Sequence, residues 1–320
     1  MRILFITATR IGDAVLSTGL LDHLIGRYPD ARITVACGPA AAPLFEAVPN
    51  LERIIVLRKK KWSLHWLDLW VSCVGQFWDV LIDLRRAPLT YLLAGRDTRH
   101  LSRNTGEAHR VIHQAGLLGL ADNPPAPRLW ATDAHEKRAA ELIGDGPPVL
   151  AIGPTANWVG KTWQPENFAK LIARLTASDG ILPGGRVAFF GHGDERSEVA
   201  DLIATVPADR CIDLMGGPDL LEVFACLKRC AIYVGNDSGL MHMAAAAQIL
   251  TLGLFGPSRE ELYGPWGKLG AFVRAEKGFD EIFPEDFDHR ITGSLMDSLG
   301  VDAVESAANE LWQRTKGAAS

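Results

Sequence analysis

Two stretches of the chain alternate short apolar runs with longer segments whose apolar residues recur at helical spacing. This alternation is typical of doubly wound α/β sheets, in which strands covered on both faces are almost continuously apolar. In the first half the pattern predicts strands at 3–6, 33–36, 54–57 and 80–83 and helices at 14–26, 41–47, 64–76 and 107–118. In the second half it predicts strands at 149–152, 187–190, 231–235 and 250–255 and helices beginning near Pro165, Asp194, Leu220 and Gly239.

Prolines and glycines separate the two halves. Prolines at 124, 125, 127, 147 and 148 flank a short charged helix, and proline extends neither a helix nor a central strand. We therefore expect an N-terminal Rossmann-like domain at 1–128, a linker at 129–148, a C-terminal Rossmann-like domain at 149–290 and a helical tail at 291–320. Open α/β sheets bind ligands at the carboxyl ends of their strands, so we expect both domains to face a central cleft.

Composition excludes several classes of protein. The 320 residues carry a net charge of −5, without the basic excess of a nucleic-acid-binding protein. The apolar run at the N-terminus is too short for a signal peptide, and no run approaches the roughly 20 apolar residues of a membrane span. Five scattered cysteines without a CxxC pair indicate a reducing compartment and core positions. A cytoplasmic enzyme is expected.

The most informative segment follows the strand at 231–235. Asp237, Ser238 and Gly239 form a turn into a helix of small residues, with His242 one turn later. Backbone N–H groups at a helix start bind anions, so the turn predicts a phosphate site. The alternative for Asp237 is a simple N-cap.

Two further turns follow strands of the second half. Gly160, Lys161 and Thr162 resemble the end of a P-loop, but Thr155 stands where that motif needs glycine. Lys161 is then either a phosphate-binding cation or a solvated surface lysine. The run 191–196 begins like a dinucleotide motif, but its third glycine is Arg196, so Asp194 or Glu195 is read as a sugar-hydroxyl ligand or a helix N-terminal charge.

One carboxylate follows the first strand of the chain. Asp13 comes after Arg10 and Gly12 at the start of the first predicted helix. It is either a first-turn helix acid or, at a strand end that borders a ligand site, a general base.

Three other patterns carry weaker hypotheses. His109 and His113 are four apart but lack a third metal ligand, and Asp286 with Asp288 follows no strand, so no metal site is expected. Lysines 59–61 precede Trp62, Trp66 and Trp70. This segment is either a surface that meets lipid headgroups or a solvated charge run beside a buried helix face.

The combination resembles glycosyltransferase family 9, the ADP-heptose lipopolysaccharide heptosyltransferases. The matching segments are 10–13, 161–168, 191–195, 235–242, 255–258 and 263–266, although Ser238 stands where the family often has threonine and the cysteine-rich C-terminal segment of many members is missing. The resemblance implies a GT-B fold of two Rossmann-like domains. It also implies that Asp13 is the base and Lys161 the cation for the leaving phosphate.

The expected donor-binding residues are Thr155, Lys161, Glu195, Asp237, Ser238, Gly239, Leu240 and His242. Arg10, Gly12 and Lys61 are the expected acceptor-binding residues. The expected reaction is inverting, metal-independent transfer of a sugar, with heptose from ADP-heptose as the first choice, to a hydroxyl of a lipopolysaccharide core or related glycan. We expect no cofactor. We do expect peripheral contact with the inner face of the cytoplasmic membrane. A nucleotide-sugar epimerase and a non-catalytic nucleotide-sugar-binding protein remain the alternatives.

Overall fold

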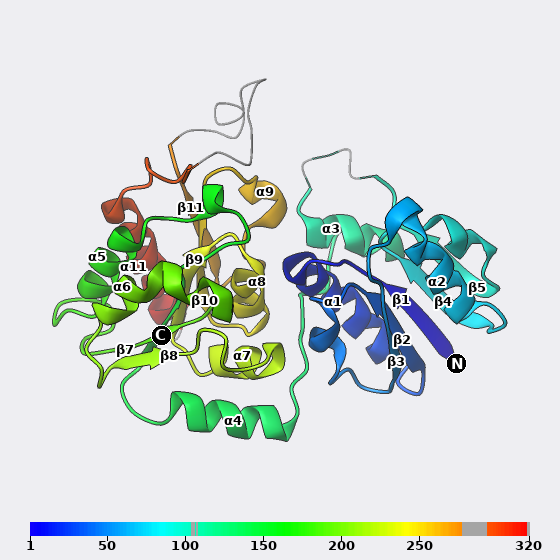
Figure 1. The fold of residues 1–320 in the computed structure, drawn as a ribbon, viewed down its shortest axis with the longest axis horizontal. Coiled ribbons are helices and arrows are strands. Elements are labelled where there is room, and N and C mark those ends of the chain that lie inside the picture. The colour runs from blue at the N-terminus through cyan, green and yellow to red at the C-terminus, as the bar shows by residue number, and fades with distance from the viewer. Residues whose placement is uncertain (104–105, 107, 277–292, 319–320) are drawn as a thin grey trace. The chain divides into compact units, whose positions relative to one another are not determined.

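A computed structural model describes residues 1–103, 106, 108–276 and 293–318. It divides into two compact units, Met1–Thr132 and Asp133–Ser320 (Figure 1). The described helices include none long and apolar enough to span a bilayer.

The first unit is a parallel sheet of five strands in the order β3-β2-β1-β4-β5. Its elements are β1 Arg2–Ile6, α1 Ile11–Arg27, β2 Arg32–Cys37, η1 Ala42–Phe45, β3 Leu51–Val56, η2 Lys61–Ser63, α2 His65–Cys73, β4 Trp78–Asp83, η3 Pro88–Leu92, β5 Gly95–His100, α3 Arg110–Ala115 and η4 Gly116–Leu118, where η marks a 3₁₀ turn.

Helix α2 covers one face of this sheet. Leu69 and Cys73 on α2 pack with Leu4, Ile6 and Leu81 in one buried cluster. Helices α1 and α3 contact each other.

The second unit is a parallel sheet of six strands in the order β11-β10-β9-β6-β7-β8. Its elements are α4 Asp133–Ile143, β6 Val149–Gly153, η5 Val159–Lys161, α5 Pro165–Leu175, β7 Arg186–Phe189, η6 Gly193–Val199, α6 Ala200–Ala204, β8 Cys211–Asp213, α7 Leu220–Leu227, β9 Ile232–Asn236, α8 Gly239–Ala246, β10 Leu250–Phe255, α9 Glu260–Tyr263, β11 Gly270–Arg274 and α11 Val301–Ala318.

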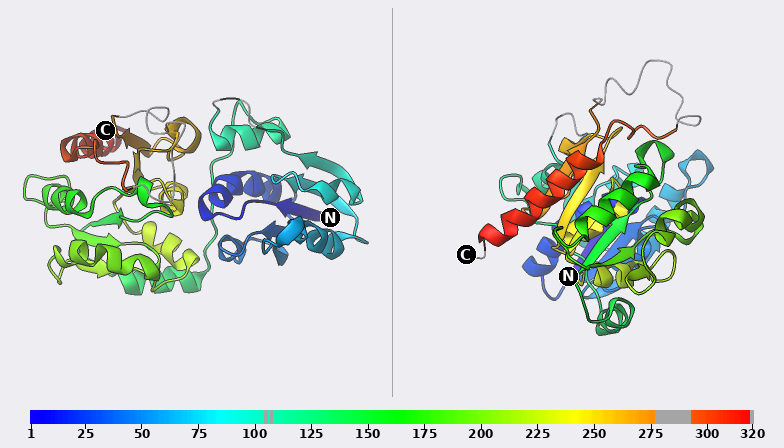
Figure 2. Two further views of the ribbon diagram at one scale, coloured as in Figure 1. Left: turned by 45° about the horizontal axis from the view of Figure 1, so that its top comes forward. Right: turned by 90° about the vertical axis from the view of Figure 1, so that its left-hand side faces the viewer.

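The structure differs from the expected boundaries in two places. Helix α4, expected within a linker at 129–148, belongs to the second unit and packs against α7. Helix α11, expected as a tail, lies along the second sheet beside α5 (Figure 2). Its Val304, Ala308 and Leu311 are buried in the core. Their spacing of four and three places them on one helix face, which explains why the helix needs a partner.

Several predicted helices are shorter or of another type. The segment expected as a helix at 41–47 is the 3₁₀ turn η1, and the one expected from Asp194 is the 3₁₀ turn η6 followed by α6. Strands β5, β8 and β11 were not predicted. All three lie in the outer part of a sheet, where a strand needs no continuous apolar run.

Candidate functional site

The direction of the strand order changes in the second sheet between β6 and β9. The chain proceeds outward from β6 to β7 and β8 on one side, while β9, β10 and β11 lie on the other. At such a point the loops after the two central strands diverge and leave a crevice, where open α/β sheets hold ligands. Lys161 follows β6 and Asp237 follows β9, so the two predicted donor-site segments meet here.

Lys161, Asp237 and Ser258 form a cluster at this edge. Lys161 Nζ donates to Asp237 Oδ2 at 2.5 Å, and Ser258 Oγ donates to the same oxygen at 2.6 Å. The Asp237 side chain is 8% exposed and that of Lys161 25%. Lys161 is therefore not a solvated surface lysine, and Asp237 is not the N-cap of α8, which is Ser238.

Asn236 fixes the two loops to each other. Its Nδ2 donates to the Pro154 carbonyl at 2.8 Å, and its Oδ1 accepts from the Trp163 backbone N–H at 3.1 Å. Asn236 and Trp163 are fully buried. The backbone on both sides of Lys161 is thus anchored to the end of β9, which limits how far the lysine can move from Asp237.

Helix α8 begins directly after Asp237. Ser238 is its N-cap, but the buried Ser238 hydroxyl makes no cap hydrogen bond. The backbone N–H groups of Gly239 and Leu240 belong to the first turn and have no intrahelical acceptor. His242 lies one turn further and is buried. This helix start can bind an anion.

Glu195 is held on the other side of β6. Its Oε2 accepts from Thr155 Oγ1 at 2.6 Å and from the His192 N–H at 3.0 Å, as part of a capping box at the start of η6. Asp194, by contrast, points into solvent as a first-turn acid. The structure thus joins two predicted donor-binding residues, Thr155 and Glu195, by a direct hydrogen bond.

Tyr233 is a buried support of this edge that sequence reasoning did not identify. Burial raises its pKa well above the ordinary value. Its hydroxyl lies where a Cβ at Gly153 or Gly235 would stand, at 2.0 and 2.4 Å, and these glycines are paired in register on β6 and β9. Both must therefore lack a side chain, so the paired glycines were the signal that could have revealed a large group between the strand ends.

In the first unit, Asp13 lies in the first turn of α1, whose N-cap is Arg10. Gly12 precedes it in the same turn, while Lys61 follows β3, two strands from β1 in the sheet. Because these strands are parallel, β1 and β3 end at the same edge of the sheet. Asp13 and Lys61 therefore both follow strands that end at this edge.

A second carboxylate at this edge, Asp83 at the end of β4, was also missed. It is fully buried and accepts from Thr90 Oγ1 at 2.7 Å and from the backbone N–H groups of Arg85 and Ala87, each at 2.8 Å. Through these hydrogen bonds Asp83 holds the loop that follows β4.

The histidines, cysteines and paired aspartates of the weaker patterns are in different environments. His109 caps α3 by accepting from the Val111 N–H, whereas both ring nitrogens of His113 are buried without a partner among the described residues. The cysteines are free thiols, and burial raises the pKa of Cys73 to about 11 and that of Cys37 to about 12. Asp286 and Asp288 lie outside the described residues. Within the described ranges no cluster of three potential metal ligands occurs.

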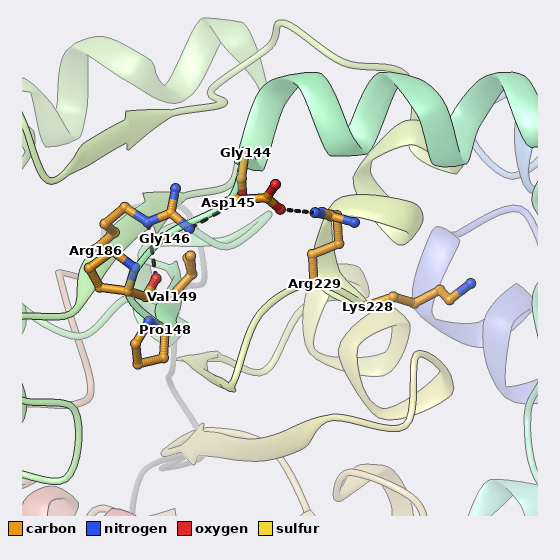
Figure 3. A pocket seen from close by; sticks show the side chains of 9 residues that line it. Gly144, Asp145, Gly146, Pro148, Val149, Arg186, Lys228 and Arg229 are labelled. Carbon is orange, nitrogen blue, oxygen red and sulfur yellow. Dashed lines mark hydrogen bonds and ion pairs between the residues drawn. The ribbon is translucent and has the colours of Figure 1, made fainter.

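A surface pocket lies at the opposite edge of the second sheet, at the amino ends of β6 and β7 (Figure 3). It is lined by residues 144–149 with Arg186, Lys228 and Arg229. Arg186 donates to the carbonyls of Ile143 and Pro147, and Arg229 pairs with Asp145 at 3.5 Å. Through these contacts the two arginines hold the segment that precedes β6.

The chain is similar to known proteins over most of its length. It is 24% identical to lipopolysaccharide heptosyltransferase 2 of Salmonella typhimurium, covering 93% of this chain and 94% of that protein. The solved structure of E. coli ADP-heptose lps heptosyltransferase II aligns with a TM-score of 0.73 at 21% identity, over 99% of this chain and 100% of that one. The glycosyl transferase family 9 structure from Veillonella parvula aligns with a TM-score of 0.78 at 20% identity, over 98% and 97%.

These alignments confirm the predicted GT-B class, two parallel sheets with interleaved helices. The family model for glycosyltransferase family 9 (heptosyltransferase) matches residues 94–281, more than half of the chain. The chain therefore belongs to glycosyltransferase family 9 and is a glycosyltransferase.

Proposed function

We propose that this enzyme transfers heptose from ADP-heptose to a hydroxyl of the lipopolysaccharide core, with inversion at the anomeric carbon and without a metal. The observation that carries the proposal is the Lys161–Asp237–Ser258 cluster beside the start of α8, at the edge where an α/β sheet holds its ligand. The names of the relatives, lipopolysaccharide heptosyltransferase and ADP-heptose heptosyltransferase, support the choice of donor and acceptor.

The donor diphosphate is expected at the N-terminus of α8. The N–H groups of Gly239 and Leu240 and the Ser238 hydroxyl supply neutral donors, and Lys161 supplies a positive charge. Asp237 would accept from sugar hydroxyls in place of Lys161, and Glu195 would accept from donor hydroxyls in place of Thr155. Thr155, once released from Glu195, would bind the donor, and His242 would contact the pyrophosphate.

In the transfer step, the Asp13 carboxylate accepts the proton of the acceptor hydroxyl. The acceptor oxygen forms a bond to the anomeric carbon as the bond from that carbon to the diphosphate oxygen breaks, and ADP leaves. Charge that develops on the diphosphate is stabilised by Lys161 and the helix N–H groups, which are in place before the reaction. Arg10, Gly12 and Lys61 would bind the acceptor. A lipid-borne acceptor places the enzyme at the inner face of the cytoplasmic membrane.

The test is a transfer assay with ADP-heptose and a heptose-deficient core acceptor, with the anomeric configuration of donor and product compared by NMR. We expect transfer with inversion, and stabilisation against heat by ADP but not by UDP or GDP. At 100 times its dissociation constant a ligand adds about 2.7 kcal/mol. Turnover of the donor without acceptor, giving an epimer, would instead support the epimerase alternative.

A further inference from the structure

Exposed apolar side chains of the described residues gather in one part of the first unit. Of twelve large ones, nine lie between positions 56 and 92: Val56, Trp62, Leu64, Leu67, Val71, Val74, Phe77, Tyr91 and Leu92. Soluble monomers rarely expose such concentrations of apolar surface unless the surface has a partner.

Helix α2 is apolar on two faces. Its inner face, with Trp66 and Trp70, packs on the core of the first unit. On its outer face, Leu67 and Val71 are four residues apart, and Val71 is 61% exposed. Val74, the C-cap that follows the helix, is exposed as well. The inner face packs on the core, whereas the outer face is exposed.

The neighbouring 3₁₀ turns also expose apolar side chains. In η2, Trp62 is 92% exposed, and its backbone has a positive φ of 57°, a conformation in which a bulky residue is rare. Turn η3, which contacts α2, exposes Tyr91 and Leu92 by 64% and 67%. We call the exposed apolar side chains of these three elements the α2 surface: Trp62 of η2, Leu67 and Val71 of α2, and Tyr91 and Leu92 of η3.

Positive charge accompanies this surface. Residues 56–92 contain six lysines and arginines and three aspartates, a net charge of +3 in a chain of net charge −5. Asp83 is buried and Asp68 is paired with Lys60 at 2.6 Å. Arg58 and Lys59 are exposed and pair with no carboxylate of the described residues. Apolar side chains with a basic rim fit the headgroup boundary of an anionic bilayer.

A second copy of the chain fits the α2 surface less well. A twofold interface would place the same patch on both sides, so the basic rims of two copies would meet. We propose that the α2 surface docks the first unit on an anionic lipid bilayer, with Trp62 and the outer face of α2 inserted at the headgroup boundary. The inference rests on the proposed function only in the choice of membrane, because vesicle binding needs neither donor nor acceptor.

The test is cosedimentation of the full chain with vesicles of phosphatidylethanolamine and phosphatidylglycerol (3:1) and with pure phosphatidylcholine. We expect binding to the anionic vesicles that weakens in high salt. R58Q/K59Q should lower the partition coefficient by more than tenfold, about fivefold per cation. The control K137Q/K170Q changes the net charge equally on exposed residues of the second unit and should bind like the parent.

V71Q/L92Q should weaken binding while transfer to a soluble acceptor fragment stays unchanged. Equal binding of the parent and R58Q/K59Q at low salt would overturn the proposal. A parent dimer that V71Q/L92Q dissociates would also overturn it, because a second copy would then cover the surface. If the parent chain binds the anionic vesicles but transfers no heptose, that result would contradict the proposed function but not this inference.

Discussion

Replacing Lys161 by methionine tests whether the ion pair with Asp237 holds the donor-site edge together. The change keeps the length of the side chain and removes its charge. Asp237, 8% exposed, would then keep the hydrogen bond from the Ser258 hydroxyl, at 2.6 Å. Removing one partner of a fully buried pair costs about 3–5 kcal/mol. Because Lys161 is 25% exposed and the serine bond persists, we expect K161M to lower the free energy of unfolding by about 2 kcal/mol.

A double-mutant cycle separates this structural cost from catalysis. Asp237→Asn removes the charge that K161M leaves unpaired, so K161M/D237N should be more stable than K161M, with a coupling energy of about 1–2 kcal/mol. Turnover should not recover, because the double variant lacks the cation for the leaving diphosphate.

The measurements are urea unfolding followed by circular dichroism, and kcat with ADP-heptose. Lys170→Met, an exposed lysine of the same unit, is the matched control and should change stability by less than about 0.5 kcal/mol. If K161M unfolds at the same urea concentration as the parent, or if the coupling energy is zero, the ion pair contributes nothing and the reasoning fails.

Four further predictions follow from single features. Asp13→Asn should lower kcat by roughly 10²-fold or more and leave ADP-heptose affinity, measured by calorimetry, nearly unchanged; near-normal kcat would exclude the base. EDTA should leave transfer intact, and a loss restored by magnesium or manganese would refute metal independence. Burial and Arg110 lower the pKa of His113, so the folded state binds its proton less readily than the unfolded state; stability should fall as pH drops below about 6.5, and His113→Phe should flatten this dependence in melts at pH 5 to 8. Gly153→Ala should cost about 1–3 kcal/mol in urea unfolding because its Cβ would overlap Tyr233, and Tyr233→Phe should recover part of it; an unchanged midpoint would contradict the tight contact.

The sequence predicted the central strands well for a physical reason. Strands β1, β6 and β9 are covered on both faces, so each is an apolar run that ends at a turn of small and polar residues. Strand β5, with the sequence GRDTRH, carries no such signal because it is at the edge of its sheet. The candidate residues Asp13, Lys161 and Asp237 were found because each lies in the segment that follows one of these apolar runs.

The partners of those residues were not predictable from local pattern. Lys161 and Asp237 are 76 positions apart, and Ser258 reaches Asp237 from the loop after β10. Only the strand order, which places β10 beside β9, brings Ser258 to the cluster. Among the tryptophans, the spacing of four wrongly grouped Trp62 with Trp66 and Trp70, because Trp62 lies before the helix in η2 and is 92% exposed. The spacing correctly placed Trp66 and Trp70 on one helix face. It did not show that this face is buried, because α2 is apolar on its outer side as well.

The pairing of the site residues with one another affects how the donor can bind. Lys161 forms an ion pair with Asp237, and the Thr155 hydroxyl donates a hydrogen bond to Glu195. The polar groups expected to bind the donor therefore already have protein partners. Donor binding must then exchange hydrogen bonds rather than add them, and each exchange gives little net affinity. The exchange at Lys161 differs, because charge on the diphosphate grows as the glycosidic bond breaks. Its attraction for the lysine is therefore greater in the transition state than in the bound donor, which raises kcat rather than affinity.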